Sequence, residues 1–213
     1  MARMVDRSSE RPPIVGWRLV GWTAVVVGGV VAATLARFGL GEAGARGVLR
    51  ATAATSFVLF TSAFVASALA RLWPTRVTRF LLLNRRYLGV SFAVSHLYHL
   101  MAILALVWLP GSSFEPVRVT VIGGSIAYVF IAAMVATSFD RTAAWLGPRW
   151  WRRLHTVGVY VLWVVFAPNY IAQAGKSPGY ALFAAIALGS LVLRLVAGVR
   201  TGSRAARLAD RAA

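Results

Sequence analysis

Six apolar stretches of about twenty residues alternate along the chain with short polar segments that carry most of the arginines. A helix that crosses a membrane needs about 20 consecutive, mainly apolar residues, because the hydrocarbon core of a bilayer is about 30 Å thick. The pattern therefore predicts six membrane-spanning helices, at residues 15–36, 51–72, 87–109, 119–139, 154–174 and 180–199.

Prolines and glycines mark the breaks between these stretches, as at Trp73-Pro74, Pro110-Gly111 and residues 175–179. Four glycines between residues 37 and 50 predict irregular backbone in the first loop: Gly39, Gly41, Gly44 and Gly47. We therefore expect an all-α integral membrane protein, a six-helix bundle over residues 15–199 with polar tails at 1–14 and 200–213.

The composition agrees with a membrane protein, since 59% of the 213 residues are hydrophobic and the mean hydropathy is +0.70. Six spans and their loops use nearly all of this length, so we expect no separate soluble catalytic domain. The sequence has no glycine-rich nucleotide-binding motif, so FAD, FMN or a nicotinamide would have to be held by a partner protein. The absence of cysteine excludes disulfides, zinc–thiolate sites and iron–sulfur clusters.

The formal net charge of +17 would suit a nucleic-acid-binding protein, but the basic residues lie between the apolar stretches. Eighteen of them fall in the two tails and at one set of helix ends, and only five fall at the other set. Basic residues gather on the cytoplasmic side of membrane proteins, so we expect both termini in the cytoplasm. The predicted surroundings are membrane lipid rather than nucleic acid.

All three histidines fall inside predicted spans: His96 and His99 in the third, and His155 in the fifth. Polar groups inside a membrane are costly and usually functional. Imidazoles on facing helices are a common way to hold a b-type haem. His96 and His99 are three residues apart and share a helix face, so a second axial ligand should come from His155. A zinc site is disfavoured because no nearby carboxylate would activate water.

Arginines flank both histidine-bearing stretches, and their simplest role is to set the membrane topology. Four of them are also candidates to pair with haem propionates, because a guanidinium matches a carboxylate: Arg85, Arg86, Arg152 and Arg153. Arg85 and His99 are 14 residues apart, nearly four helical turns, and should share one face of the third span. Aromatic residues near His155 are candidates to flank a haem or quinone edge or to anchor the helix at the interface: Trp150, Trp151, Tyr160 and Trp163.

Two signatures in this region resemble the ferric reductase-like transmembrane domain family, and most closely the haem-binding membrane subunits of bacterial methionine-sulfoxide reductase systems. They are Arg85-Arg86-x-Leu88-Gly89 followed by His99, and Thr137-Ser138 followed by Leu146-Gly147-x-x-x-Trp151-x-x-Leu154-His155 with Tyr160. The resemblance covers residues 50–200. It implies a haem b subunit that carries electrons across the bacterial inner membrane. The implied donor is a cytosolic flavin reductase or quinol, and the implied acceptor is a periplasmic methionine-sulfoxide reductase or a ferric substrate.

The same resemblance implies that His99 and His155 are haem ligands. Relatives commonly carry a further histidine about thirteen residues beyond the first in the fifth span, where this chain has Ala167-Pro168-Asn169-Tyr170. We therefore expect one haem rather than two. Arg86 marks the predicted cytoplasmic edge of the third span, and His96 lies about 15 Å along the helix from it, against about 20 Å for His99. This depth favours His96 as the ligand that pairs with His155. The alignment favours His99, so both remain candidates.

An alternative from a different class is a small transporter or assembly factor that uses these histidines as proton relays or packing groups. The absence of Asp and Glu from the predicted spans argues against a proton-coupled carrier.

Overall fold

The computed structural model describes residues 15–210, with side chains described as far as Arg200. Within that range the chain forms eight α-helices and one short 3-10 helix, without strands. They are α1 Trp17–Phe38, α2 Glu42–Leu72, α3 Arg76–Leu83, α4 Arg85–Trp108, α5 Arg118–Ala136, α6 Asp140–Leu146, α7 Pro148–Ile171, the 3-10 turn Ala174–Lys176 and α8 Pro178–Asp210. The predicted tail at residues 1–14 lies outside the described residues.

Six of the described helices are long and apolar enough to cross a membrane, namely α1, α2, α4, α5, α7 and α8. Many of their aliphatic side chains point outward, as Val25 and Val129 do at 66% and 69% exposure. Such exposure would be costly in water and is favourable in lipid. The predicted all-α bundle of six spans is confirmed.

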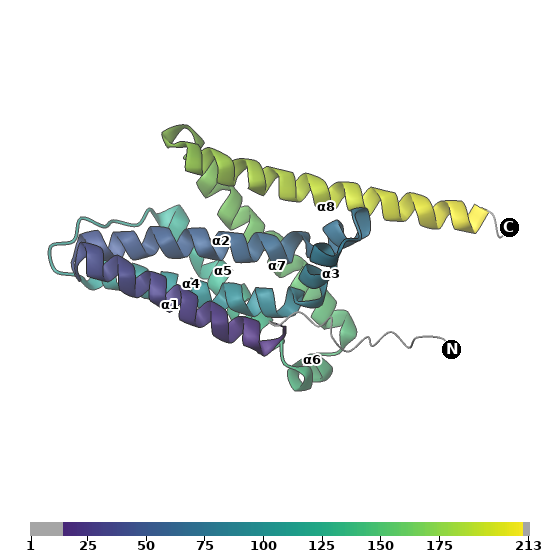
Figure 1. Ribbon diagram of the computed structural model, residues 1–213, viewed down its shortest axis with the longest axis horizontal. Coiled ribbons are helices and arrows are strands. Elements are labelled where there is room, and N and C mark those ends of the chain that lie inside the picture. The colour runs from purple at the N-terminus through teal and green to yellow at the C-terminus, as the bar shows by residue number, and fades with distance from the viewer. Residues whose placement is uncertain (1–14, 211–213) are drawn as a thin grey trace, which may run out of the picture.

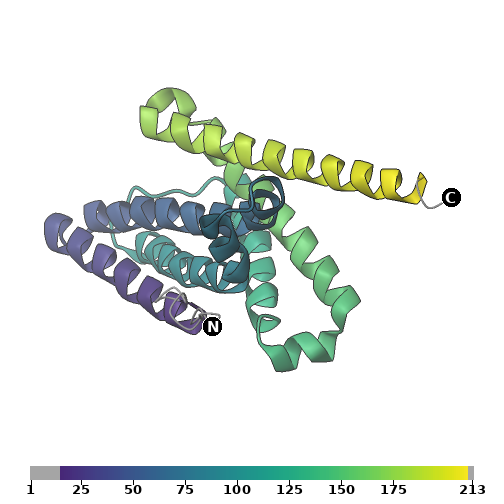
Figure 2. The same ribbon diagram turned by 45° about the vertical axis from the view of Figure 1, so that its right-hand side comes forward.

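The helices fall into a group of three, a pair and a long outer helix (Figure 1). Helices α1, α2 and α4 pack side by side, α5 packs on α7, and α8 lies along α2 and α7. Figure 2 shows α5 and α7 diverging from α2 and α4 toward α6, the short helix that joins them. The start of α1 and the end of α8 lie at the same end of the molecule, as an even number of spans requires.

The predicted irregular loop at residues 37–50 is wrong beyond Gly41, because α2 already begins at Glu42. Gly44 and Gly47 are helical and buried where α2 meets α1. A Cβ on Gly47 would lie 2.8 Å from the Thr34 methyl group, so a larger residue would push the two helices apart. These glycines allow close helix packing in a membrane rather than breaking the helix.

Helix α7 begins at Pro148, six residues before the predicted start of the fifth span. Gly147 has φ 78°, a left-handed conformation that favours glycine, and Pro148 suits the first helical turn, where no N–H is needed. The earlier start places His155 two turns inside the helix. The predicted loop at residues 71–86 also contains a helix, α3, whose start is capped by Thr75 and Thr78.

The core of the bundle contains a group of packed aromatic side chains. Phe57, Phe60 and Phe64 form one stripe on α2 and meet Phe166 of α7 and Phe92 of α4. The Phe60 and Phe166 rings stack with centroids 5.5 Å apart. Such ring pairs add to the energy of burial and fix the spacing of the three helices.

Candidate functional site

One stripe along α4 carries most of the predicted site residues on that helix. It contains Arg85, Gly89, Phe92, His96 and His99, spaced four, three, four and three residues apart. Its first three members line a cavity, whereas the two histidines lie farther along, in a packed part of the bundle. Arg85 and His99 therefore share a face of α4, as predicted, but Arg85 lines the cavity and His99 does not.

The cavity has a volume of about 770 Å³ and lies among α2, α4, α5, α7 and α8. Pockets for small molecules and cofactors commonly measure 300–1,000 Å³, on the order of this one. Its walls are largely apolar and include Phe60, Phe64, Phe92 and Tyr160. None of the described lining residues is acidic. Five arginines line the cavity, namely Arg71, Arg85, Arg86, Arg152 and Arg194. The cavity therefore suits an amphipathic anion.

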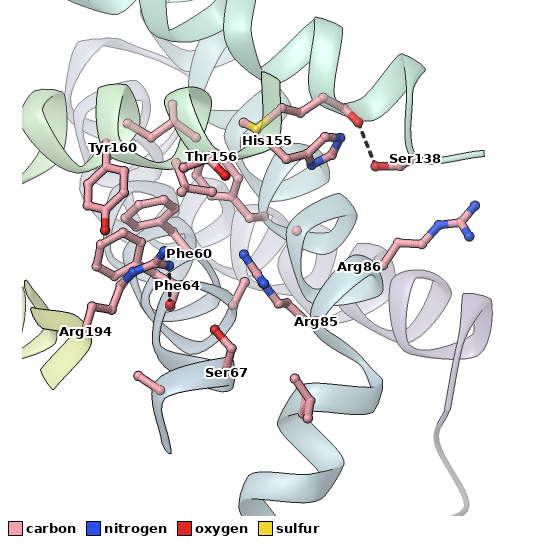
Figure 3. A pocket seen from close by; sticks show the side chains of 18 of the residues that line it. Phe60, Phe64, Ser67, Arg85, Arg86, Ser138, His155, Thr156, Tyr160 and Arg194 are labelled. Atoms are coloured by element: carbon pink, nitrogen blue, oxygen red, sulfur yellow. Dashed lines mark hydrogen bonds between the residues drawn. The ribbon is translucent and has the colours of Figure 1, made fainter. Parts of the chain in front are cut away.

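His155 is the histidine of this cavity (Figure 3). Its Nε2 lies 3.0 Å from Thr137 Oγ1, and that hydroxyl donates to the Ala133 carbonyl 2.8 Å away. The hydroxyl therefore accepts from the ring, so Nε2 carries the hydrogen and Nδ1 keeps its lone pair. A neutral imidazole held in this way can bind a metal through the free nitrogen.

Thr137 positions a second residue of the site as well. Its carbonyl accepts a hydrogen bond from Trp151 Nε1 at 2.9 Å, and the Trp151 ring stacks on His155 with centroids 4.2 Å apart. Ser138, next in the chain, lines the same cavity. Residues that the sequence places in separate signatures thus meet at the end of α5 and the start of α7.

The four predicted arginines have different positions. Arg85 reaches into the cavity, while Arg86 extends away from it and donates to Asp140 Oδ1 at 2.6 Å (Figure 3). Arg152 lines the cavity with an exposed side chain. Arg153 is not a lining residue, and its guanidinium lies 5.1 Å from the centre of the Trp150 ring. Arg85 is therefore the best placed of the four to meet a bound anion.

Arg194 of α8 also lines the cavity, although it was not among the arginines predicted from the sequence to meet a ligand. Its Nη1 donates to the Phe64 carbonyl at 2.8 Å. The guanidinium also lies 4.4 Å from the Phe64 ring centre and 5.0 Å from that of Tyr160. An arginine five residues inside the predicted end of an apolar span was the available signal, because charge at that depth is costly.

His96 and His99 lie together on α4, where His99 contacts α2 and the His96 ring also packs against Tyr128 of α5 and Phe166 of α7. Their rings stack with centroids 4.9 Å apart and an interplanar angle of 14°. His99 Nδ1 lies 3.1 Å from the Leu49 carbonyl, which can only accept, so Nδ1 carries the hydrogen and Nε2 keeps the lone pair. A histidine that ligates a metal commonly shows this pattern.

His96 has a different environment, since its Nδ1 is buried without a hydrogen-bond partner among the described residues. Its ring lies between His99 and Phe92, and the Phe92 ring is 5.3 Å away by centroids. Phe92 also lines the cavity, so it stands between the cavity and the histidine pair. The structure therefore does not bring all three histidines onto one cavity. The described residues contain no group of three or more side chains suited to hold a metal ion.

Of the predicted aromatic residues, Trp151 and Tyr160 line the cavity and Trp150 lies outside it. Trp163 donates from Nε1 to the Ala187 carbonyl at 3.0 Å and so ties α7 to α8. Comparison with models of protein families, with curated proteins and with solved structures finds no match.

Proposed function

We propose that this chain is a b-type cytochrome subunit that carries electrons across the membrane. The observation that supports the proposal is the cavity lined by α4 and α7, which combines an imidazole, arginines from several helices and aromatic walls. Each of these features matches a part of haem: an iron that accepts a nitrogen ligand, two carboxylate arms and a flat apolar ring.

The donor set of the cavity fits a haem held by one protein histidine. His155 would supply the ligand through Nδ1, with Thr137 fixing the ring, and the arginines would bind the carboxylates. When bound, haem supplies reversible one-electron chemistry, which none of the side chains present provides. His96 and His99, predicted as ligands from the sequence, do not line the cavity, and Phe92, which lines it, packs against the His96 ring.

The proposed electron partners are those that the resemblance to the ferric reductase-like family implies. Because the sequence has no nucleotide-binding motif, the subunit would receive electrons from a partner, which on that resemblance is a cytosolic flavin reductase or quinol. It would pass them to a periplasmic acceptor such as a methionine-sulfoxide reductase or a ferric substrate, across a bacterial inner membrane. The arginines of the cavity belong to the basic ends predicted to face the cytoplasm, so the cavity would open toward the donor.

An absorption spectrum tests the proposal directly. The protein purified in detergent from haem-replete cells should show a Soret band that shifts on reduction with dithionite. A colourless protein that is folded and monodisperse would overturn the cytochrome proposal.

A buried polar cluster favours the alternative of a proton-translocating carrier. Ser95 Oγ lies 2.9 Å from Ser56 Oγ and 3.0 Å from Thr55 Oγ1, while Ser91 Oγ and His96 Nδ1 lack partners. Such groups could pass a proton if water joined them. A colourless protein that acidifies the lumen of liposomes, and stops doing so with His96→Phe, would support this function over electron transfer.

A further inference from the structure

Two arginines approach the cavity from opposite sides. Arg85 extends from α4 and Arg194 from α8, and their guanidinium groups point toward the same space (Figure 3). Arg71, on α2, lines the same cavity. Three arginines from three different helices therefore line one cavity.

Gathering like charges in a partly desolvated space costs free energy unless a counter-charge is present. None of the described lining residues is a carboxylate. Asp140 is already paired with Arg86, and Glu42 is paired with Arg46 and Ser113. The Arg85 guanidinium has no hydrogen bond or ion pair with any residue that the structure describes. The cluster is therefore short of negative charge, which a bound anion would supply.

Arg194 is also held in place before any anion binds. The Phe64 carbonyl accepts from Nη1, and the Phe64 and Tyr160 rings lie near its planar group. Aromatic contact of this kind restricts a guanidinium while leaving its other N–H donors free. A fixed arginine facing an unpaired one is a suitable arrangement for an anionic group.

We infer that Arg85 and Arg194, supported by the charge of Arg71, form the anion-binding site that receives the carboxylate groups of the haem. This inference rests on the proposed function and names which arginines serve it. It replaces the sequence-based expectation for Arg86 and Arg153, whose guanidinium groups point to Asp140 and Trp150. It also adds Arg194, a residue of α8, to the site.

The test compares Arg85→Gln, Arg194→Gln and the double variant with the wild type and with Arg79→Gln. Arg79 is an exposed arginine on α3, outside the cavity, so its substitution removes the same charge elsewhere. Rates of haem transfer to an acceptor apoprotein and the midpoint potential of the bound haem are measured. Each cavity substitution should weaken haem retention about tenfold or more, the usual scale for losing a charge-assisted hydrogen bond. It should also lower the potential, because removing positive charge favours the oxidised iron. Arg79→Gln should change neither quantity.

Arg194→Lys is a second variant for the case in which glutamine impairs folding. It keeps the charge but loses the planar contacts, so it should retain more haem than Arg194→Gln and hold the potential nearer to that of wild type. Size-exclusion profiles identify any variant that has lost its fold.

The outcomes separate this inference from the proposed function. A colourless wild type overturns the proposed function and the inference together. A coloured wild type whose double variant keeps its haem affinity and potential overturns the inference alone. Anionic phospholipid binds basic pockets between membrane helices by the same chemistry. If native mass spectrometry shows that the double variant loses a bound phospholipid but keeps its haem, the arginines hold lipid and the inference is wrong.

Discussion

The two ends of the α4 stripe place the same residue type in opposite surroundings. His155 faces the end near Arg85, in a cavity with arginines and with one ring nitrogen fixed by Thr137. His96 and His99 lie at the other end, stacked on each other and closed off by Phe92. His155 is the better candidate ligand of the three because it lines the cavity, whereas His96 and His99 do not. Cost of burial alone does not distinguish the two ends.

The largest effects are expected when each imidazole is removed separately. His155→Ala should abolish most haem binding, because it removes the nitrogen donor of the cavity. His99→Ala should keep the haem, since its ring lies outside the cavity. Pyridine haemochrome content per protein measures both.

The spin state of the wild-type haem distinguishes ligation by His155 alone from ligation that also involves His96 or His99. A haem held by His155 alone should give a high-spin spectrum. A low-spin spectrum that His96→Ala or His99→Ala converts to high-spin would show that Phe92 moves and that the pair reaches the iron. Full haem content in His155→Ala would refute its assignment as ligand.

A smaller effect is expected from Thr137→Val, which keeps the shape of the side chain but removes the hydroxyl that holds His155 Nε2. Loss of a hydrogen bond that orients a metal ligand commonly costs about 10- to 100-fold in affinity. Haem dissociation should accelerate by about that factor. Ser138→Ala is the matched control, because Ser138 lines the cavity but its hydroxyl donates to the Met134 carbonyl at the end of α5 rather than to a histidine. Equal effects of the two substitutions would contradict the role given to Thr137.

The sequence alone predicted the six spans well, because each apolar stretch is long enough to cross a bilayer on its own. The sequence-based prediction failed at the start of α2, where a loop was expected. Gly44 and Gly47 serve helix packing there, and composition could not distinguish glycines in a packed helix from glycines in a loop. The helix start at Pro148 was likewise hidden by the polar and aromatic residues 149–153.

The site was predictable only in part. Local spacing placed Arg85 and His99 on one stripe of α4, since that depends on a single helix. Spacing could not show that Phe92 lies between the cavity and His96. It also could not show that Arg194 of α8 lines the cavity. Those facts depend on how helices far apart in the sequence pack together.

The packing that brings Thr137 to His155 can be tested at Gly158, where α5 and α7 touch. A Cβ there would lie 2.7 Å from Met134 Sδ and 3.2 Å from Phe130. Gly158→Val should lower stability by about 1–3 kcal/mol through overpacking. Gly123→Ala is the control on the same helix pair, because its Cβ would make ordinary contact with Val165 at 3.9 Å. Apparent Tm in detergent should fall for the first and stay near wild type for the second. An unchanged Tm in Gly158→Val would show that the flexible Met134 side chain moves aside without loss of packing.

The smallest expected effects distinguish the two histidines of the closed end. His96 is 7% exposed and its Nδ1 has no partner, so His96→Phe removes an unsatisfied buried polar atom while keeping a flat ring between Phe92 and His99. Such a change should leave the apparent Tm unchanged or raise it slightly. His99→Phe loses the hydrogen bond to the Leu49 carbonyl and should cost about 1 kcal/mol. If His96→Phe instead proves the more destabilising of the two, its Nδ1 has a partner in the folded protein, and an internal water in the Ser–Thr cluster becomes the natural candidate. That result would turn the closed end from a packed region into a hydrated one, and it would favour proton movement over packing as the reason for its two histidines.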